Sequence, residues 1–360
     1  SITADFYQRT TRDMIGPAES IPSISGIASD DRAKVNNATL RNRGWELSVS
    51  WNDKLKCGFS YGIGFNVFNY KAVVTKYNNP EGIIYNNHTG LAANKGYYEG
   101  MDIGEIWGYR ADDLFLSNRE IDDYLRNVNL TAFKSNDLWR RGDLKYIDSN
   151  GDGRVDGGKG TLADHGDLQI IGNTTPKYSF GINLNLGYKG FEISTLLQGV
   201  AKRDFPISGS NYMFGGNNYN FKEHLDYFST ENPNGYLPRL TGWKDDKDFL
   251  VNTGYNTTRY LLNAAYMRMK NLTVGYTFNK KQLRHIGISN LKVYVTCDNL
   301  FTVTKLPKQF DPETLNQVNM SAGGDAQNAA PGLTSPMKQN GNGMVYPMNR
   351  NFVFGLDFTF

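Results

Sequence analysis

Alternation of large apolar residues with small or polar ones is the dominant pattern of this chain, and it is clearest in the last ten residues. Every even position from residue 352 to residue 360 is Phe or Leu, whereas Asn351, Gly355, Asp357 and Thr359 occupy odd positions. Period-two alternation is typical of a strand whose two faces meet different surroundings. It fits a transmembrane β-barrel strand, apolar toward lipid and polar toward the lumen. The edge strand of a soluble sandwich would look the same.

The same alternation recurs in seven further segments, so the sequence predicts about eight strands in all. They cover residues 1–11, 45–52, 55–67, 178–188, 191–198, 272–278, 291–298 and 351–360. The segment 55–67 is longer than the five or six residues typical of soluble sheets, and it suits a tilted membrane span. In the segment 178–188, Tyr178 and Tyr188 flank aliphatic residues, as in barrel strands with aromatic girdles at both interfaces.

Short and long connections alternate strictly between these strands. The short ones cover residues 53–54, 189–190 and 279–290, and the long ones cover residues 13–39, 73–177, 203–258 and 304–349. Outer-membrane barrels have short periplasmic turns and long extracellular loops, whereas a soluble sandwich has no reason to sort its loops. The sequence therefore predicts an all-β, transmembrane antiparallel β-barrel in the bacterial outer membrane. Its long loops are expected to be extracellular and its C-terminus, at Phe360, periplasmic.

Composition agrees with this prediction and excludes several other classes. The chain has 22 Tyr, 20 Phe and 38 Gly, which suits aromatic girdles, turns and small lumen-facing positions. No run of about 18 apolar residues predicts a transmembrane helix, and residues 1–7 already alternate like a strand, so no signal peptide is predicted. A net charge of +3 is too small to indicate nucleic acid as a partner. Cys57 and Cys297 form neither a disulfide framework nor a metal motif.

One segment of the second long connection, residues 148–156, has the spacing of a calcium-binding loop. The oxygen ligands predicted at positions 1, 3, 5, 7 and 9 are Asp148, Asn150, Asp152, the Arg154 carbonyl and Asp156. Gly153 stands at position 6, where the calcium loop turns sharply. A structural Ca²⁺ or Mg²⁺ that stiffens the loop is the predicted ion, and no cofactor for chemistry is predicted.

The position-12 ligand departs from that spacing, because Lys159 replaces the bidentate Glu. Asp164 or Asp167 could supply the missing carboxylate if the loop folds back. The alternative is a cluster of Asx turns that holds no ion.

Aromatic residues crowd the long connections. Those expected to contact a ligand or a protein partner are Trp107, Tyr109, Trp139, Tyr212, Tyr219 and Trp243. Aromatic faces bind sugar rings or anchor a partner, so both uses fit. The alternative is that many of them pack the connections into compact caps.

One short helix is predicted near residues 117–127, because Ser117 and Glu120 have the spacing of a capping box. No enzymatic site is predicted. Asp112 and Asp113 are adjacent in sequence and fit a solvated turn better than a glycosidase pair. The four His residues are scattered singly and suggest neither a triad nor a zinc site.

Several blocks, in order and over nearly the whole chain, resemble the C-terminal barrel half of the SusC/RagA family of TonB-dependent transporters. The matching blocks cover residues 42–47, 142–153, 175–181, 188–194, 263–276, 298–302 and 346–360. The resemblance implies a barrel of about 22 strands with an N-terminal plug. Residues 1–360 would then be the C-terminal portion, and the plug and the N-terminal strands would lie outside this chain.

The resemblance also implies a function and partners. The expected function is active import of a large nutrient, an oligosaccharide or a peptide, gated by a SusD-like surface lipoprotein and driven by the TonB complex through the absent N-terminal part. The remainder of the barrel and plug and the outer-membrane lipid complete the expected partners. A surface adhesin or receptor barrel without transport is the functional alternative. A closed barrel of eight strands is the structural alternative, although it leaves little lumen for polar faces.

Overall fold

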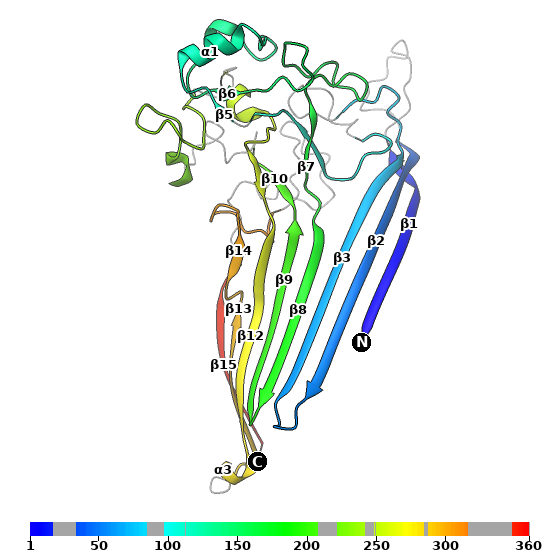
Figure 1. Ribbon diagram of the computed structural model, residues 1–360. Coiled ribbons are helices and arrows are strands. Elements are labelled where there is room, and N and C mark those ends of the chain that lie inside the picture. The colour runs from blue at the N-terminus through cyan, green and yellow to red at the C-terminus, as the bar shows by residue number, and fades with distance from the viewer. Residues whose placement is uncertain are drawn as a thin grey trace.

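Eight long antiparallel strands form one sheet in the computed structural model, in the order β1, β2, β3, β8, β9, β12, β13 and β15, with the short strand β14 paired to β12 (Figure 1). The structure describes residues 1–16, 34–84, 97–111, 113–207, 222–241, 248, 250–283, 287–315 and 348–359. The strands of the sheet are β1 Ile2–Gly16, β2 Val35–Lys54, β3 Ser60–Lys76, β8 Lys177–Tyr188, β9 Phe191–Lys202, β12 Tyr266–Phe278, β13 Asn290–Asp298, β14 Thr302–Thr304 and β15 Asn351–Thr359. The predicted all-β class and the eight long strands are confirmed.

Some strand limits differ from the sequence prediction, since β2 begins at Val35 rather than at residue 45 and β3 ends at Lys76 rather than at residue 67. The turn predicted at residues 53–54 lies later, because β2 continues to Lys54 and the Leu55 amide donates to the Phe59 carbonyl at 2.8 Å. Gly58 has a φ of 89°, which only a glycine adopts freely, so the chain reverses there. The other tight turn is as predicted, since Lys189 and Gly190 both have positive φ between β8 and β9, as a two-residue hairpin requires.

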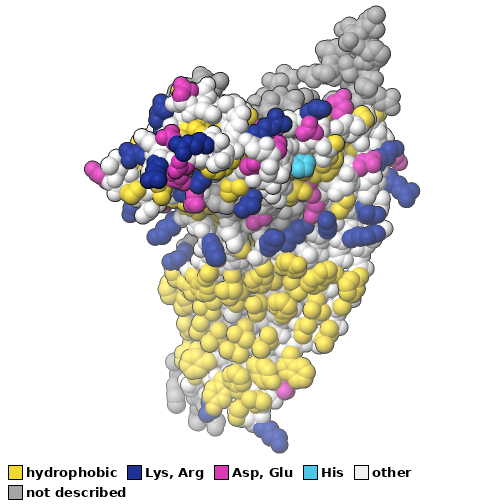
Figure 2. All heavy atoms as spheres, turned by 45° about the horizontal axis from the view of Figure 1, so that its top comes forward, with side chains coloured by type: hydrophobic (Ala, Val, Ile, Leu, Met, Phe, Trp, Pro, Cys, Tyr) yellow, Lys and Arg dark blue, Asp and Glu magenta, His cyan; other side chains and the backbone are white. Residues whose placement is uncertain are grey.

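The strand register places the apolar residues on one face of the sheet. Leu47 pairs with Val67, which pairs with Phe180, so these three form an apolar row across β2, β3 and β8. The adjacent row, Ser48, Asn66 and Gly181, projects from the opposite face because side chains alternate along each strand. Figure 2 shows the apolar face as a continuous hydrophobic band. That band is the surface that a lipid bilayer would cover.

The sheet is open, with β1 at one edge and β15 at the other (Figure 1). Within the described residues, β1 pairs only with β2, and β15 pairs only with β13. The two edges therefore do not close on each other, and the alternative of a closed eight-stranded barrel is wrong. The fold is that of part of a larger barrel.

The long connections gather at one end of the sheet and form a second body, which we call the head (Figure 1). Three small antiparallel pairs belong to it, namely β4 Glu105–Gly108 with β7 Gln169–Asn173, β5 Asp113–Leu114 with β6 Leu144–Lys145, and β10 Asp204–Pro206 with β11 Leu261–Asn263. It also contains short 3₁₀ helices at Asn136–Leu138 and Lys222–Leu225 and a π-helical turn at Leu250–Gly254. The main hydrophobic core lies in the head.

The predicted helix in the head is present as α1, Asn118–Leu125. Ser117 caps it, because its hydroxyl accepts from the Glu120 amide at 3.1 Å, and the Glu120 carboxylate accepts from the Leu116 amide at 2.9 Å. The other described α-helix is α3, Lys280–Leu283, in the short connection after β12. None of the helices among the described residues has the length and apolar character that a bilayer crossing needs.

The face assignment predicts different outcomes for two adjacent positions in β8. Leu184 lies on the apolar face between Ile63 and Thr195, and Asn183 projects from the other face. Leu184→Arg should cost about 2–4 kcal/mol of folding free energy in a bilayer, because it places a charge in lipid. Asn183→Arg is the matched control and should cost much less. Urea titration of the barrel refolded in phospholipid vesicles measures both, and equal costs would contradict the assignment.

Candidate functional site

The head is built around one hydrophobic core to which three long connections contribute. Tyr109 and Tyr146 come from the second long connection, Tyr255 from the third and Phe310 from the last, and all except the partly buried Tyr255 are among its buried residues. The rings of Tyr146 and Phe133 stack with centroids 4.3 Å apart, and Tyr109 packs edge-on against both. The connections therefore form one packed unit rather than separate loops.

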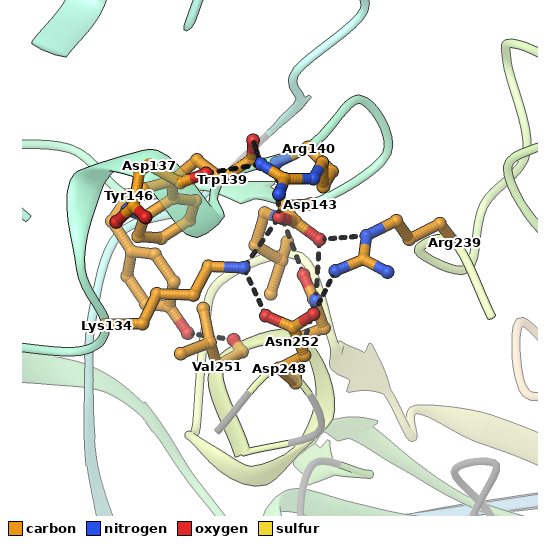
Figure 3. A network of polar contacts seen from close by, with 11 residues as sticks. Lys134, Asp137, Trp139, Arg140, Asp143, Tyr146, Arg239, Asp248, Val251 and Asn252 are labelled. Atoms are coloured by element: carbon orange, nitrogen blue, oxygen red, sulfur yellow. Dashed lines mark hydrogen bonds and ion pairs between the residues drawn. The ribbon is translucent and has the colours of Figure 1, made fainter. Parts of the chain in front are cut away.

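A buried cluster of charged residues crosses this core, and Figure 3 shows its members converging. The Lys134 ammonium donates to Asp143 at 2.7 Å and to Asp248 at 2.6 Å. The side chains of Lys134 and Asp143 have no exposed surface. Lys134 also lies over the Trp139 ring, with Nζ 4.6 Å from its centroid. An ammonium removed from water in this way is stabilised only because two carboxylates accept hydrogen bonds from it.

The same two carboxylates bind a second cation from another segment. Arg239 Nε donates to Asp143 at 2.6 Å, and its terminal nitrogen contacts Asp248. Asn252 donates to Asp143 at 2.8 Å and accepts from the Leu144 amide at 2.8 Å. Two acids and two bases thus balance their charges, and the cluster ties the segment around Asp143 to the segments around Arg239 and Asp248.

The protonation of Asp248 depends on these partners. Burial alone would raise its pKa, but the hydrogen bonds and charges of Lys134 and Arg239 outweigh burial and hold the pKa below its ordinary value. The folded state therefore binds a proton less readily than the unfolded chain. The contribution of Asp248 to stability is present above the ordinary pKa of aspartate, about 4, and is lost as pH falls through the lowered pKa of Asp248.

A second ion cluster joins the head to the sheet. Arg268 of β12 is 4% exposed and donates to both carboxylate oxygens of Asp311, at 2.9 and 2.8 Å. Its other terminal nitrogen lies 3.1 Å from Glu313, which also accepts from Lys270 at 2.8 Å. These ion pairs hold the segment after β14 against the sheet. Leu306 and Phe310 of that segment belong to the core of the head.

The predicted metal loop has a compact, hydrogen-bonded form. Asp148 accepts from the amides of Gly151 at 2.6 Å and Gly153 at 2.8 Å, as in an Asx turn. Arg154 Nε lies 3.4 Å from Asp152 and 3.2 Å from Asp156, so its guanidinium neutralises two of the predicted ligands. Across the described residues, no group of three or more His, Cys, Asp and Glu converges as metal ligands would. Ion binding by this loop stays a prediction.

Asp167, one of the two residues that could replace the position-12 carboxylate, contacts this loop. It is 2% exposed and accepts from the Ser149 amide at 2.6 Å and the Asp156 amide at 3.0 Å. Burial raises its pKa most, these amides oppose the rise, and the charge of Asp148 adds to it. A cation between Asp148 and Asp167 would have the opposite effect and favour both ionised carboxylates.

Three of the six predicted aromatic contact residues, Trp107, Tyr109 and Trp139, are among the described residues. Tyr109 is 4% exposed and Trp139 is 3% exposed, so their rings pack the core and present almost no surface to a ligand. Trp107 is partly buried, and its indole N–H donates to the Tyr98 hydroxyl at 3.3 Å. The remaining predictions, Tyr212, Tyr219 and Trp243, lie outside the described residues, as do Asp112 and Phe360.

The inner face of the sheet is hollowed near the short turns. A hollow of about 630 Å³ is lined by small and polar residues, among them Asn52, Asn185 and Ser194. Across it, Lys292 of β13 donates to Glu192 of β9 at 2.6 Å, over Gly275 of β12. Glu192 and Lys292 are 100 residues apart in the chain, so the sequence alone does not pair them.

Comparison with known proteins relates the chain to outer-membrane receptors. No family model matches. The chain is 25% identical over 315 residues to TonB-dependent receptor P3 of Formosa agariphila, which covers 87% of this chain and 28% of the receptor. It is 24% identical over 401 residues to TonB-dependent receptor P39 of the same organism, a match that covers 100% of this chain and 34% of the receptor. It is 21% identical over 321 residues to TonB-dependent receptor SusC of Bacteroides thetaiotaomicron, with 88% and 28% covered.

Solved structures share the fold. The RagAB peptide transporter superposes with a TM-score of 0.56 at 21% identity, over 87% of this chain and 30% of that one. The RagAB peptide importer in its open-open state gives a TM-score of 0.57 at 20% identity, with the same coverage. The chain thus spans about a third of the length of the relatives it matches. The resemblance predicted from the sequence is confirmed.

The buried charge cluster predicts a large effect of removing one cation. Lys134→Met should destabilise the head by about 3–5 kcal/mol, because Asp143 keeps its burial but loses a partner. Hydrogen exchange of the paired amides in β5 and β6 measures the loss. Arg126→Met, which removes an exposed partner of Asp123, is the matched control and should cost at most about 1 kcal/mol. Equal protection in the two variants would show that the cluster does not hold the head together.

The metal loop predicts calcium binding by the intact protein. Titration calorimetry should detect binding that Asp148→Ala with Asp152→Ala abolishes, and the double variant should exchange loop amides faster because Asp148 no longer accepts from Gly151 and Gly153. Asp122→Ala with Asp137→Ala removes the same charge from exposed positions of the head and should bind calcium normally. An absence of binding at saturating calcium would leave the ion-free Asx cluster as the correct interpretation.

Proposed function

We propose that this chain, a relative of the TonB-dependent receptors, forms part of the wall and the outer head of a barrel that imports a large nutrient across the bacterial outer membrane. The observation that carries the proposal is the two-faced sheet, apolar on one side and small or polar on the other, in a chain that matches these receptors over most of its length. The proposed nutrient is an oligosaccharide or a peptide. The likeness to RagAB, a peptide transporter, supports the second.

The inner face supports the presence of a plug. In a barrel of about 22 strands the lumen is wide enough to hold a folded domain. Small residues such as Gly62 and Gly275 and polar ones such as Asn185 line the hollow there, so a polar domain could approach the wall closely. The plug and the segment that contacts TonB would be supplied by other parts of the protein.

The proposed orientation puts the head outside the cell and the short turns in the periplasm. Long extracellular and short periplasmic connections are the rule in outer-membrane barrels. The head is a packed unit with its own core, which suits a rigid platform for a partner. An adhesin would also need a head, but the match to TonB-dependent receptors favours transport.

The proposed partner of the head is a SusD-like surface lipoprotein. Leu116, Leu138 and Leu240 are 52%, 41% and 53% exposed. Each leucine is next in sequence to a residue of one set of contacts. Leu116 follows Phe115, whose carbonyl accepts from the Gly142 amide, and Leu240 follows Arg239, whose amide donates to the Gly142 carbonyl. Leu138 precedes Trp139, whose ring packs on Phe115. Exposed leucines gathered on a rigid surface are typical of a docking site for a protein.

Growth and co-purification test this proposal together. Cells that lack the protein should fail to grow on a mixture of oligosaccharides or on a protein digest as sole carbon source, yet grow normally on glucose. Restoring the protein with Leu116→Asp and Leu240→Asp should leave the barrel in the membrane but reduce the co-purified lipoprotein and slow this growth, because two charges replace apolar contacts.

Leu162→Asp provides the control, since Leu162 is an exposed leucine of the head beside Gly82. Normal growth of the deletion strain on both mixtures would argue against import. Normal growth and co-purification of the double variant would argue only against this docking surface.

A further inference from the structure

A group of basic side chains lies on the outer face of the sheet at the border between the hydrophobic band and the head. Figure 2 shows Lys and Arg side chains gathered along this border. The register identifies a pair among the outward-facing residues, since Arg43 of β2 lies directly opposite Lys71 of β3. Both residues are exposed.

The strand alternation places this pair on the lipid-facing side. Arg43 is two residues from Trp45, and Lys71 is two residues from Asn69, the register partner of Trp45. Trp45 in turn packs against Tyr178, with ring centroids 6.5 Å apart. Trp and Tyr sit at the level of the lipid headgroups in membrane proteins. The basic pair is therefore one step further from the bilayer centre than the aromatic pair, at the height of the headgroup phosphates.

The basic pair has no acidic partner within the described part of the chain. Like charges directly opposite each other destabilise a sheet, so an unneutralised pair favours the binding of an anion. Arg43 Nε donates to Gln8 of β1 at 2.6 Å, which orients the guanidinium and leaves its two terminal nitrogens for another acceptor. Arg41, on the same face two residues before Arg43 in β2, adds a third positive charge.

We propose that Arg43 and Lys71, with Arg41, bind the phosphate of an anionic lipid in the leaflet on the head side of the membrane. A guanidinium offers two parallel N–H donors to phosphate oxygens, and an ammonium adds a point charge. The hydrophobic band below, beginning at Trp45 and Leu47, would contact the acyl chains of the same lipid. This inference rests on the membrane location of the sheet and is independent of what the barrel transports.

Lipid retention by the purified full-length protein tests the proposal. Native mass spectrometry in detergent would measure binding of phosphatidylglycerol and of phosphatidylcholine, whose phosphate charge is balanced. The wild type should prefer phosphatidylglycerol to phosphatidylcholine. The double variant Arg43→Gln with Lys71→Gln should bind phosphatidylglycerol about thirtyfold more weakly, because it lacks two positive charges near the membrane surface. Arg43→Lys, which keeps the charge, should retain most of the binding.

Arg119→Gln with Lys159→Gln removes two exposed charges from the head and should bind lipid as the wild type does. Heat-dependent gel mobility verifies that each variant is a folded barrel. Unchanged binding of phosphatidylglycerol by the folded Arg43 and Lys71 double variant would overturn the proposal, and so would equal binding of the two lipids by the wild type. Displacement of the lipid by millimolar inorganic phosphate would show a free-phosphate site instead.

Discussion

The structure depends on the hydrogen-bonded register of its long antiparallel strands. Each backbone pair fixes which side chains share a face, and a shift of one residue would turn every apolar residue of a strand toward the lumen. In the rows through Leu47 and Ser48, the register keeps lipid-facing and lumen-facing residues apart across three strands. The hydrophobic band, the polar hollow and the basic border follow from this one arrangement. The edges at β1 and β15 are open for a separate reason, because a tilted sheet of eight long strands spans only part of a wide barrel.

The head depends on a different interaction, the desolvated charge cluster around Asp143. A carboxylate with no exposed surface is tolerated there because Lys134, Arg239 and Asn252 all donate to it. Lys134 belongs to the same connection as Asp143, whereas Arg239 and Asn252 are 96 and 109 residues away from it, so the cluster specifies one arrangement of two connections. The aromatic core supplies apolar burial, but rings can slide over one another, whereas hydrogen-bonded charges cannot. The buried ion pair between Arg268 and Asp311 fixes the junction between the head and the sheet in the same way.

The candidate sites show how burial decides the use of a residue. Tyr109 and Trp139 have the residue type expected of a ligand surface, yet both lie in the core of the head, where packing covers almost all of each ring. The leucines at positions 116, 138 and 240 have the type expected of a core, yet they are exposed. Residue type and position in a connection do not distinguish the buried aromatic residues from the exposed leucines. The long connections lack the regular alternation of apolar and polar residues that would identify their buried positions.

The sequence by itself determined the class of fold, the number of long strands, the faces of the residues within the predicted strands and the order of short and long connections. Period-two alternation is local, so it can be identified without knowing which strands are neighbours. The cap of α1 by Ser117 was predictable for the same reason. Only the tertiary structure decided that the connections form one head, that Lys134 meets Asp143 and Asp248, and that Arg43 stands opposite Lys71. Lys134 and Asp248 are 114 residues apart in the chain, and even Lys134 and Asp143, nine residues apart, belong to no regular element that would bring them together. Only the folded register and the packed core bring these residues into contact.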